Sequence, residues 1–235
     1  MKRVTDFIIA FAGLLVASPL LAVLCAGVWL QDLRTPFYVS DRACSVGSFR
    51  MLKLRTMVVR ADQLGGTSTA ETDPRVTSFG RFLRRFKLDE LPQLWNVFVG
   101  DMSLVGPRPQ ALPDVDSYTE TERQILAVRP GITDISSIVF SDEGAILAGA
   151  PDPDVRYNQI IRPWKSRLAL LYIERRTMVV DFEIIVLTVI TLVSRRVALG
   201  GVERILRRWG ADSELLRVAR RTIQPYPAPI PGMVD

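Results

Sequence analysis

The hydrophobic pattern is dominated by an uninterrupted apolar segment near the amino terminus. The stretch from Phe7 to Leu30 carries no charged residue, and as a straight helix it would be about 36 Å long, enough to cross a hydrocarbon core of about 30 Å. Pro19 lies in its middle and removes a backbone hydrogen bond, while the Ser18 hydroxyl can satisfy the carbonyl left free. The pattern predicts a membrane helix that bends at Ser18 and Pro19, with arms of about 18 Å each, about half a bilayer.

This segment is compatible with three arrangements. A cleaved signal peptide is disfavoured, because the apolar run is long and no convincing small-residue cleavage site accompanies it. A kinked span would place the two ends on opposite sides of the membrane, whereas a re-entrant hairpin would return to the side it entered from. The flanking charges leave the choice open, since Lys2 and Arg3 precede the segment while Asp32 and Arg34 follow it.

The remaining pattern predicts an α+β, mostly helical chain. Thr35–Val39 and Ser48–Thr56 have the composition of short strands around a turn at Cys44–Gly47. The Asp181–Ser194 stretch is apolar nearly all round but too short to span a bilayer, which predicts a buried or half-inserted helix. Helical spacing of apolar residues also occurs in Leu91–Val99, Thr119–Val128 and Trp164–Arg176.

Two segments predict basic amphipathic helices. In Phe79–Leu88, phenylalanines and a leucine recur at helical spacing and basic residues fill the other positions. This helix either packs on the core with a solvated basic face or rests its phenylalanines in the lipid interface with its arginines among phosphates. A second such segment surrounds Trp209, and Pro225–Pro231 predicts an extended, mobile tail.

Composition narrows the possible chemistry. The net charge of +5 and the pI near 9.5 favour an anionic partner, which could be nucleic acid, a phosphate-bearing ligand or an acidic membrane face. P-loop, dinucleotide, zinc-finger and RNA-recognition signatures are all missing from the sequence, so nucleic acid is not expected. The two cysteines cannot form a disulfide framework, and the lack of histidine excludes Ser-His and Cys-His catalysis. Catalysis would have to use carboxylates, Lys, Arg and hydroxyls.

The stretch KLDELPQ contains two adjacent acids, Asp89 and Glu90. One interpretation is structural: Asp89 caps a helix whose first turn tolerates Pro92, and Glu90 suits the positive end of the helix dipole. The other is a reaction centre, because a basic helix leads into the acids and a proline-stiffened loop presents Arg108 beyond the next helix. A carboxylate could attack phosphorus while Mg²⁺ on oxygen ligands neutralises a diphosphate and Arg or Lys holds its oxygens.

Four blocks of the sequence form a recognisable set: KLRTM (53–57), DPRVTSFGRFLRR (73–85), LDELPQLWNVFVGDMSLVGPRP (88–109) and RPGIT (129–133). Together they resemble one known family, the bacterial sugar transferases, which are polyprenyl-phosphate hexose-1-phosphate transferases with a monotopic membrane fold. The resemblance covers roughly Lys2 to Ser194 and includes Ser18-Pro19, which marks the bend of a re-entrant helix in this family.

The resemblance implies a role for each site residue. Asp89 would attack the β-phosphorus of a UDP-sugar and release UMP, and polyprenyl phosphate would then take the phosphosugar from Asp89. Glu90 would complete the acid pair and, with Asp89, hold Mg²⁺. The residues implied to contact substrate phosphates are Arg84, Arg108, Lys53, Arg55 and Gln93.

The resemblance also implies an organisation and a location. We expect a re-entrant membrane helix at 1–34, a small cytosolic catalytic domain with interfacial amphipathic helices at 35–199, and a basic helix with a Pro-rich tail at 200–235. Because UDP-sugars are cytosolic, the catalytic domain should face the cytosol at the bacterial inner membrane, in contact with membrane lipids. The product would initiate a lipid-linked surface glycan such as exopolysaccharide, capsule or O-antigen. Whether the chain forms a homo-oligomer stays open.

The sequence departs from the commoner family pattern after RPGIT. Many members continue with Gly-Trp, whereas this chain has Asp134–Ser137, so the partners of the sugar hydroxyls are expected there and the sugar stays open. Another donor nucleotide or a shorter prenyl acceptor is a further possibility. An alternative class is a catalytically silent, membrane-bound adaptor whose basic residues serve only lipid adhesion. The intact Asp89–Glu90 pair argues against it.

Overall fold

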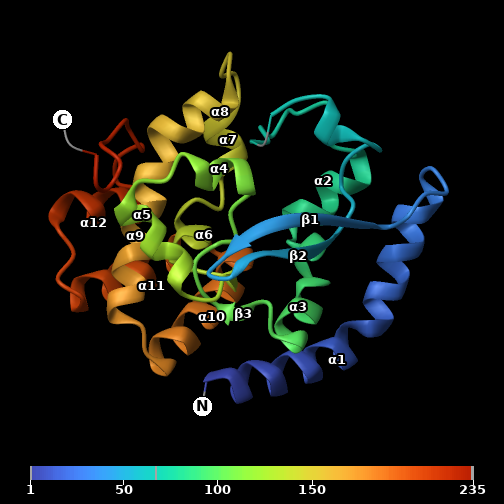
Figure 1. The fold of residues 1–235 in the computed structure, drawn as a ribbon, viewed down its shortest axis with the longest axis horizontal. Helices are drawn as coiled ribbons and strands as arrows, with labels where there is room; N and C mark the ends of the chain where they lie inside the picture. The colour runs from blue at the N-terminus through green and yellow to red at the C-terminus, as the bar shows by residue number, and fades with distance from the viewer. Residues whose placement is uncertain (1, 67, 234–235) are drawn as a thin grey trace.

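The apolar amino-terminal segment forms one long, bent helix at the periphery of the protein. The computed structural model describes residues 2–66 and 68–233, and α1 (Lys2–Leu30) changes direction along its length, so that its two arms follow two sides of the molecule (Figure 1). Pro19 lies inside the helix, and the Ser18 hydroxyl donates a 2.8 Å hydrogen bond to the Leu15 carbonyl. Proline has no N–H, so Pro19 cannot donate to the Leu15 carbonyl four residues earlier. The Ser18 hydroxyl takes its place, as the sequence predicted.

By length and composition, α1 is a candidate membrane span, and few of its residues are buried within the protein. Its apolar side chains are mostly exposed, Val16 to 83%. The elements that follow fill the inside of its bend: the Leu94 side chain lies against Gly13 in the first arm, and the Phe79 ring lies against Gly27 in the second. These two glycines allow a close approach that a larger residue would hinder.

The two predicted strands form a hairpin. β1 (Phe37–Cys44) pairs antiparallel with β2 (Gly47–Leu54), and Cys44 is opposite Gly47 in the register. Gly47 has a φ of 118°, a conformation that suits glycine in a tight hairpin turn. The first strand extends five residues beyond the predicted Val39, because pairing with β2 continues to the turn.

The basic amphipathic helix is shorter than predicted. After a 3₁₀ turn at Ala61–Gln63, α2 runs over Ser78–Arg85 and is capped by Thr77, whose side chain accepts a hydrogen bond from the Gly80 amide. Lys87 then has a φ of 53°, which ends the helix. A 3₁₀ turn at Leu88–Glu90 and helix α3 (Gln93–Val99) follow.

A second small sheet links the first half of the chain to the helical half. β3 (Ser103–Val105) pairs parallel with β4 (Gly131–Thr133). Between and after these strands lie short elements: α4 (Leu112–Asp116), α5 (Glu120–Arg123) with a 3₁₀ turn at Gln124–Ala127, α6 (Ile135–Val139), α7 (Glu143–Leu147), α8 (Pro153–Arg156) and a π-helical turn at Tyr157–Ile161. The predicted helix at Thr119–Val128 is therefore one α turn followed by one 3₁₀ turn.

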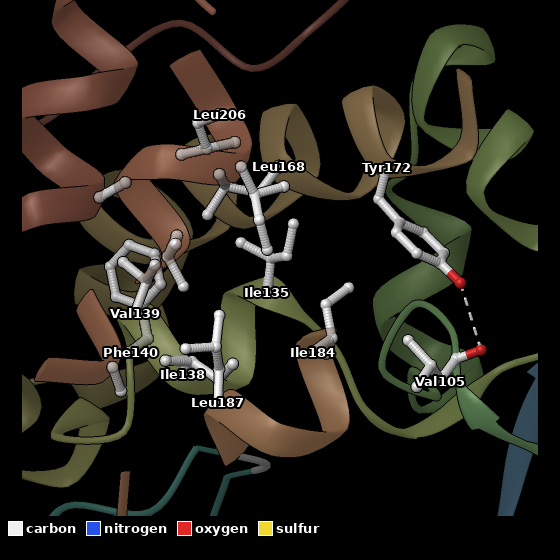
Figure 2. Close-up of a cluster of buried hydrophobic side chains, with 14 of the residues drawn as sticks. Val105, Ile135, Ile138, Val139, Phe140, Leu168, Tyr172, Ile184, Leu187 and Leu206 are labelled. Carbon is white, nitrogen blue, oxygen red and sulfur yellow. Dashed lines mark hydrogen bonds between the residues drawn. The ribbon is translucent and has the colours of Figure 1, made fainter. Parts of the chain in front are cut away.

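Four longer helices build the main core with α6. They are α9 (Arg162–Arg175), α10 (Met178–Val193), α11 (Arg195–Arg208) and α12 (Ser213–Arg220). Figure 2 shows aliphatic side chains of α6, α9, α10 and α11 converging, with the Tyr172 hydroxyl directed at the Val105 carbonyl at the end of β3. Each fully buried leucine or isoleucine here stabilises the fold by about 1.5–3 kcal/mol. A smaller cluster (Leu24, Val28, Leu54 and Leu83) joins α1 to β2 and α2.

Helix α10 was expected to be buried or half-inserted, and in the structure it is buried on one side only. Val180, Ile184 and Leu187 are buried in the core, whereas Phe182 and Val193 are exposed, Val193 to 89%. Apolar side chains gathered on an exposed face are unfavourable in water, so this face of α10 is suited to an apolar environment. The fold class is α+β and mostly helical, as predicted.

The carboxy-terminal part differs from the expectation. The predicted boundary between residues 199 and 200 falls inside α11, and α11 and α12 contribute buried residues to the main core. The Pro-rich segment is extended, but it is attached to the helices instead of lying free: Trp164 donates from Nε1 to the Tyr226 carbonyl at 2.9 Å, and the Thr119 hydroxyl donates to the Pro231 carbonyl at 2.6 Å. These long-range contacts are the reason why a composition-based prediction of mobility failed.

Candidate active site

The two adjacent acids lie in a buried 3₁₀ turn between α2 and α3. Asp89 is 8% exposed and Glu90 is 9% exposed. The helix that follows begins at Gln93 after Pro92 and has no side-chain cap, so the interpretation of Asp89 as an N-cap was wrong. The positive φ of Lys87 separates the acids from α2 and starts a new turn, which directs both carboxylates inward instead of along a helix end.

Glu90 is held by two cations from distant elements. Its Oε1 accepts a 3.0 Å hydrogen bond from Lys53 Nζ on β2 and a 2.9 Å hydrogen bond from Arg108 Nη2 on the loop after β3. Burial alone would raise the pKa of Glu90, but the fields of Lys53, Arg108 and Lys87 outweigh it and hold this pKa far below its ordinary value. Glu90 is therefore an ionised, positioned carboxylate.

Asp89 has the opposite character. Its carboxylate has no hydrogen-bond or ion-pair partner among the residues that the structure describes. Burial raises the pKa of Asp89, and repulsion from Glu90 adds to this, while attraction by Lys53 and Arg84 opposes it. An unpaired, partly desolvated carboxylate is a stronger nucleophile than one engaged by hydrogen bonds, because no partner has to be displaced before it attacks.

Four cations surround the two carboxylates: Lys53, Arg84, Lys87 and Arg108 all act on the charge of Asp89 or Glu90. Arg84 is oriented by Thr56, whose hydroxyl accepts a 2.8 Å hydrogen bond from Arg84 Nε. Burial lowers the pKa of Lys53, Arg84 and Lys87, so that each is an incompletely neutralised cation. The surplus positive charge fits an anionic ligand such as a diphosphate.

Two further residues were predicted to contact phosphates, Arg55 and Gln93. Arg55 is engaged elsewhere, whereas Gln93 follows the acid pair closely in the chain. Arg55 is buried and forms a bidentate ion pair with Asp32, in which both N···O distances are 2.6 Å. Its Nε also donates to the Thr35 carbonyl at 3.0 Å. Its guanidinium thus joins the end of α1 to β2. Gln93 is 2% exposed, and its Nε2 has no hydrogen-bond partner among the described residues, so this amide could donate to a ligand oxygen.

The acids can be tested as ligands for Mg²⁺ on their own chemistry. No group of three or more His, Cys, Asp or Glu side chains suited to a metal ion occurs in the described ranges 2–66 and 68–233. Mg²⁺ bound with a nucleotide commonly takes only one or two carboxylates, and phosphate and water oxygens complete its octahedron. Asp89 and the second oxygen of Glu90 meet that requirement, so the residues present fit the ion.

The sequence located the acids and their main cations but missed other parts of the site. Lys87 lies two residues before Asp89 at the end of a basic run, and the sequence gave no signal of its left-handed backbone conformation. Thr56 follows Lys53 in the KLRTM block and could have been noticed there. Tyr118 and Tyr157, which line a cleft beside Arg108, lie in segments without a motif, so no local signal could have identified them.

The buried acid pair is enclosed by cations, and its surplus positive charge could hold a phosphate-bearing ligand. Residues 1–195 match the family described as bacterial sugar transferase. The chain belongs to the bacterial sugar transferase family.

Relatives in this family carry names that describe sugar 1-phosphate transfer or exopolysaccharide production. A UDP-glucose:undecaprenyl-phosphate glucose-1-phosphate transferase of Xanthomonas campestris is 33% identical over 207 residues, which cover 84% of this chain and 40% of that protein. The exopolysaccharide production protein ExoY of Rhizobium meliloti is 37% identical over 153 residues, 58% of this chain and 68% of that protein.

A Bacillus subtilis protein is 42% identical over 111 residues, 47% of this chain and 62% of that protein. It bears the provisional name of an undecaprenyl-phosphate N-acetylgalactosaminyl 1-phosphate transferase. The chain therefore spans less than two thirds of the length of both the Bacillus and the Xanthomonas relative.

Proposed function

We propose that this chain transfers a sugar 1-phosphate from a UDP-sugar to polyprenyl phosphate, with Asp89 as the nucleophile. The observation that carries the proposal is the division of roles in the acid pair: Glu90 is fixed by Lys53 and Arg108, whereas the neighbouring Asp89 carboxylate is unpaired. The relatives' names support the substrate classes.

The reaction proceeds in two balanced displacements. An Asp89 oxygen attacks the β-phosphorus of the donor, the bond from that phosphorus to the bridging oxygen breaks, and UMP departs with the electron pair. The phosphosugar is then bound to Asp89 as an acyl phosphate. A phosphate oxygen of the polyprenyl phosphate attacks the same phosphorus, the Asp89–phosphorus bond breaks, and the carboxylate is regenerated.

The other residues of the site act on charge and position. Arg108, on a loop stiffened by Pro107 and Pro109, and Arg84, oriented by Thr56, hold the non-bridging oxygens of the phosphates. Gln93 donates its unpaired amide to a ligand oxygen. Mg²⁺, when held by Asp89 and Glu90, would neutralise diphosphate charge.

We further propose that α1 is re-entrant, and the contacts at its two ends support this. At the first end, Lys2 pairs with Asp181 of α10, and Asp6 accepts a 2.6 Å hydrogen bond from Ser103 of β3. At the other end, Asp32 pairs with Arg55, which directly follows β2. Attachment of both ends of the helix to one globular body supports an arrangement in which the helix enters and leaves the bilayer on the same side.

The exposed apolar faces of α1 and α10 would then enter one leaflet of the bacterial inner membrane, with the acid pair on the cytosolic side. Lys2 of α1 pairs with Asp181 near the start of α10, so the two helices are linked at this end. The α2 phenylalanines Phe82 and Phe86 are also exposed and suit the headgroup layer. This arrangement brings a lipid phosphate and a cytosolic nucleotide sugar to the same site. The product would initiate a lipid-linked surface glycan.

The test is a two-stage release assay on the full chain purified in detergent. With Mg²⁺ and a panel of UDP-sugars, the wild type should release about one UMP per active site without acceptor and turn over repeatedly when undecaprenyl phosphate is added. Asp89→Asn should abolish both stages, and the exposed control Asp41→Asn should retain both. A wild type that releases no UMP with any donor would refute the transferase proposal and favour a silent adaptor.

A further inference from the structure

A polar cleft adjoins the acid pair on the other side of Arg108. It is a small cleft that opens to solvent, and it lies between the loop after β3, α4, the π-helical turn and the first turns of α9. Arg108 lines this cleft and also donates to Glu90. A phosphorus atom held between Asp89 and Arg108 would therefore direct one of its substituents into the cleft.

The cations deeper in the cleft are already neutralised. Arg162 pairs with Glu122 at 2.6 Å, and Lys165 pairs with Glu143. Attraction by Glu143 and Tyr157 outweighs the effect of burial and raises the pKa of Lys165, which therefore keeps its charge. A second phosphate would have to compete with these carboxylates. The cleft is better suited to an uncharged, polar part of a ligand than to another anion.

Two tyrosines supply the polar groups for such a ligand. The guanidinium of Arg162 lies 5.0 Å from the centre of the Tyr118 ring, and Lys165 Nζ lies 5.2 Å from the centre of the Tyr157 ring, so both rings are fixed by cation–π contacts. Neither phenolic hydroxyl has a hydrogen-bond partner among the described residues. Burial raises the pKa of both tyrosines, so their hydroxyls stay protonated and can donate as well as accept.

The segment in which the sequence placed the hydroxyl partners has another task. Asp134 caps α6: it accepts a 2.8 Å hydrogen bond from the Ser137 amide and also bonds both serine hydroxyls, Ser136 and Ser137. Asp134 and Ser136 line the cleft, but their side chains are engaged with each other. The unpartnered hydroxyls in the cleft belong to the tyrosines.

We infer that this cleft is the sugar subsite of the donor, in which the Tyr118 and Tyr157 hydroxyls bond the hydroxyl groups of the hexose and Arg162 and Lys165 position the two rings. The inference rests on the proposed transferase function and deepens it. The negative charge of uridine monophosphate would find no free cation in the cleft, because Arg162 and Lys165 are already paired with carboxylates. A pyranose is neutral and rich in hydroxyls. Tyr118 and Tyr157 thus determine which sugar is transferred.

The test compares Tyr118→Phe and Tyr157→Phe with the wild type, and Tyr38→Phe, an exposed tyrosine on β1, is the matched control. The measured quantities are kcat/KM for UMP release with UDP-glucose, UDP-galactose and UDP-N-acetylglucosamine, and the inhibition constant of UMP. Loss of one hydrogen bond should lower kcat/KM for the preferred sugar by about tenfold. The same substitution should lower kcat/KM less for sugars that lack the matching hydroxyl, and the inhibition constant of UMP should not change.

Each outcome decides the question. Unchanged UMP inhibition shows that a variant is folded, so an unaltered sugar preference in such a variant would overturn the sugar subsite. A loss equal for all sugars, together with weaker UMP inhibition, would assign the cleft to the nucleotide instead. Absence of UMP release by the wild type with every sugar would refute the transferase function itself, and the subsite with it.

Discussion

Removal of the Glu122 carboxylate should destabilise the protein strongly, because it leaves a buried arginine without its counter-charge. Glu122 is fully buried, and it accepts hydrogen bonds from Arg162 Nε at 3.0 Å, Arg162 Nη2 at 2.6 Å and Ser166 Oγ at 2.7 Å. Breaking a buried ion pair from one side costs about 3–5 kcal/mol. At about 2–4 °C per kcal/mol for a chain of this size, Glu122→Leu should lower the midpoint of thermal unfolding by about 6–20 °C.

The assay is thermal unfolding in detergent micelles, followed by tryptophan fluorescence. Trp164, two residues from Arg162, is fully buried and reports on this part of the core. The double variant Glu122→Leu/Arg162→Met removes both charges, and its stability should return to within about 2 kcal/mol of the wild type. A single variant that loses less than about 1 kcal/mol, or a double variant less stable than the single one, would refute the reasoning that the unpaired charge is the cause.

The acid pair and the membrane helix make two further predictions. Because burial raises the pKa of Asp89, and this residue must be ionised to attack, UMP release should fall on acidification at a pH above the ordinary aspartate range. Lys53→Met removes a cation that lowers this pKa, so the acid limb should move to higher pH; a shift to lower pH would contradict the charge assignment. Single cysteines at Val4 and Leu33, exposed positions at the two ends of α1, should react with a membrane-impermeant reagent from the same side of sealed vesicles, in a chain without its native cysteines. Labelling from opposite sides would establish a kinked span.

Features that depend on neighbouring residues could be predicted from the sequence. The bend of α1 needs only Pro19 and the hydroxyl of Ser18 one residue earlier, and both act on the same carbonyl. The hairpin follows from strand composition and a glycine turn. Helix α10 could be predicted as a buried or half-inserted helix because its sequence is apolar nearly all round and too short to span a bilayer. The acid pair was visible because its two members are adjacent.

Features that depend on contacts between distant segments could not be predicted. The N-cap interpretation failed because the conformation of Lys87 interrupts the helix, and nothing local distinguishes a 3₁₀ turn from a helix start. The role of Arg55 could not be predicted, because the ion pair with Asp32 forms only when the end of α1 packs beside the end of β2. The docking of the Pro-rich segment depends on Trp164 and Thr119, which precede it by more than sixty residues. In each case the partner is chosen by the tertiary fold.

In the proposed reaction Asp89 becomes covalently bonded to the phosphosugar. This bond can be detected by intact-mass measurement and peptide mapping of the chain incubated with Mg²⁺ and a reactive UDP-sugar in the absence of lipid acceptor. We expect a mass increase of one hexose phosphate on the peptide that contains Asp89, which disappears when undecaprenyl phosphate is added and does not form in Asp89→Asn. An adduct on another residue, or UMP release by Asp89→Asn at the wild-type rate, would contradict this expectation.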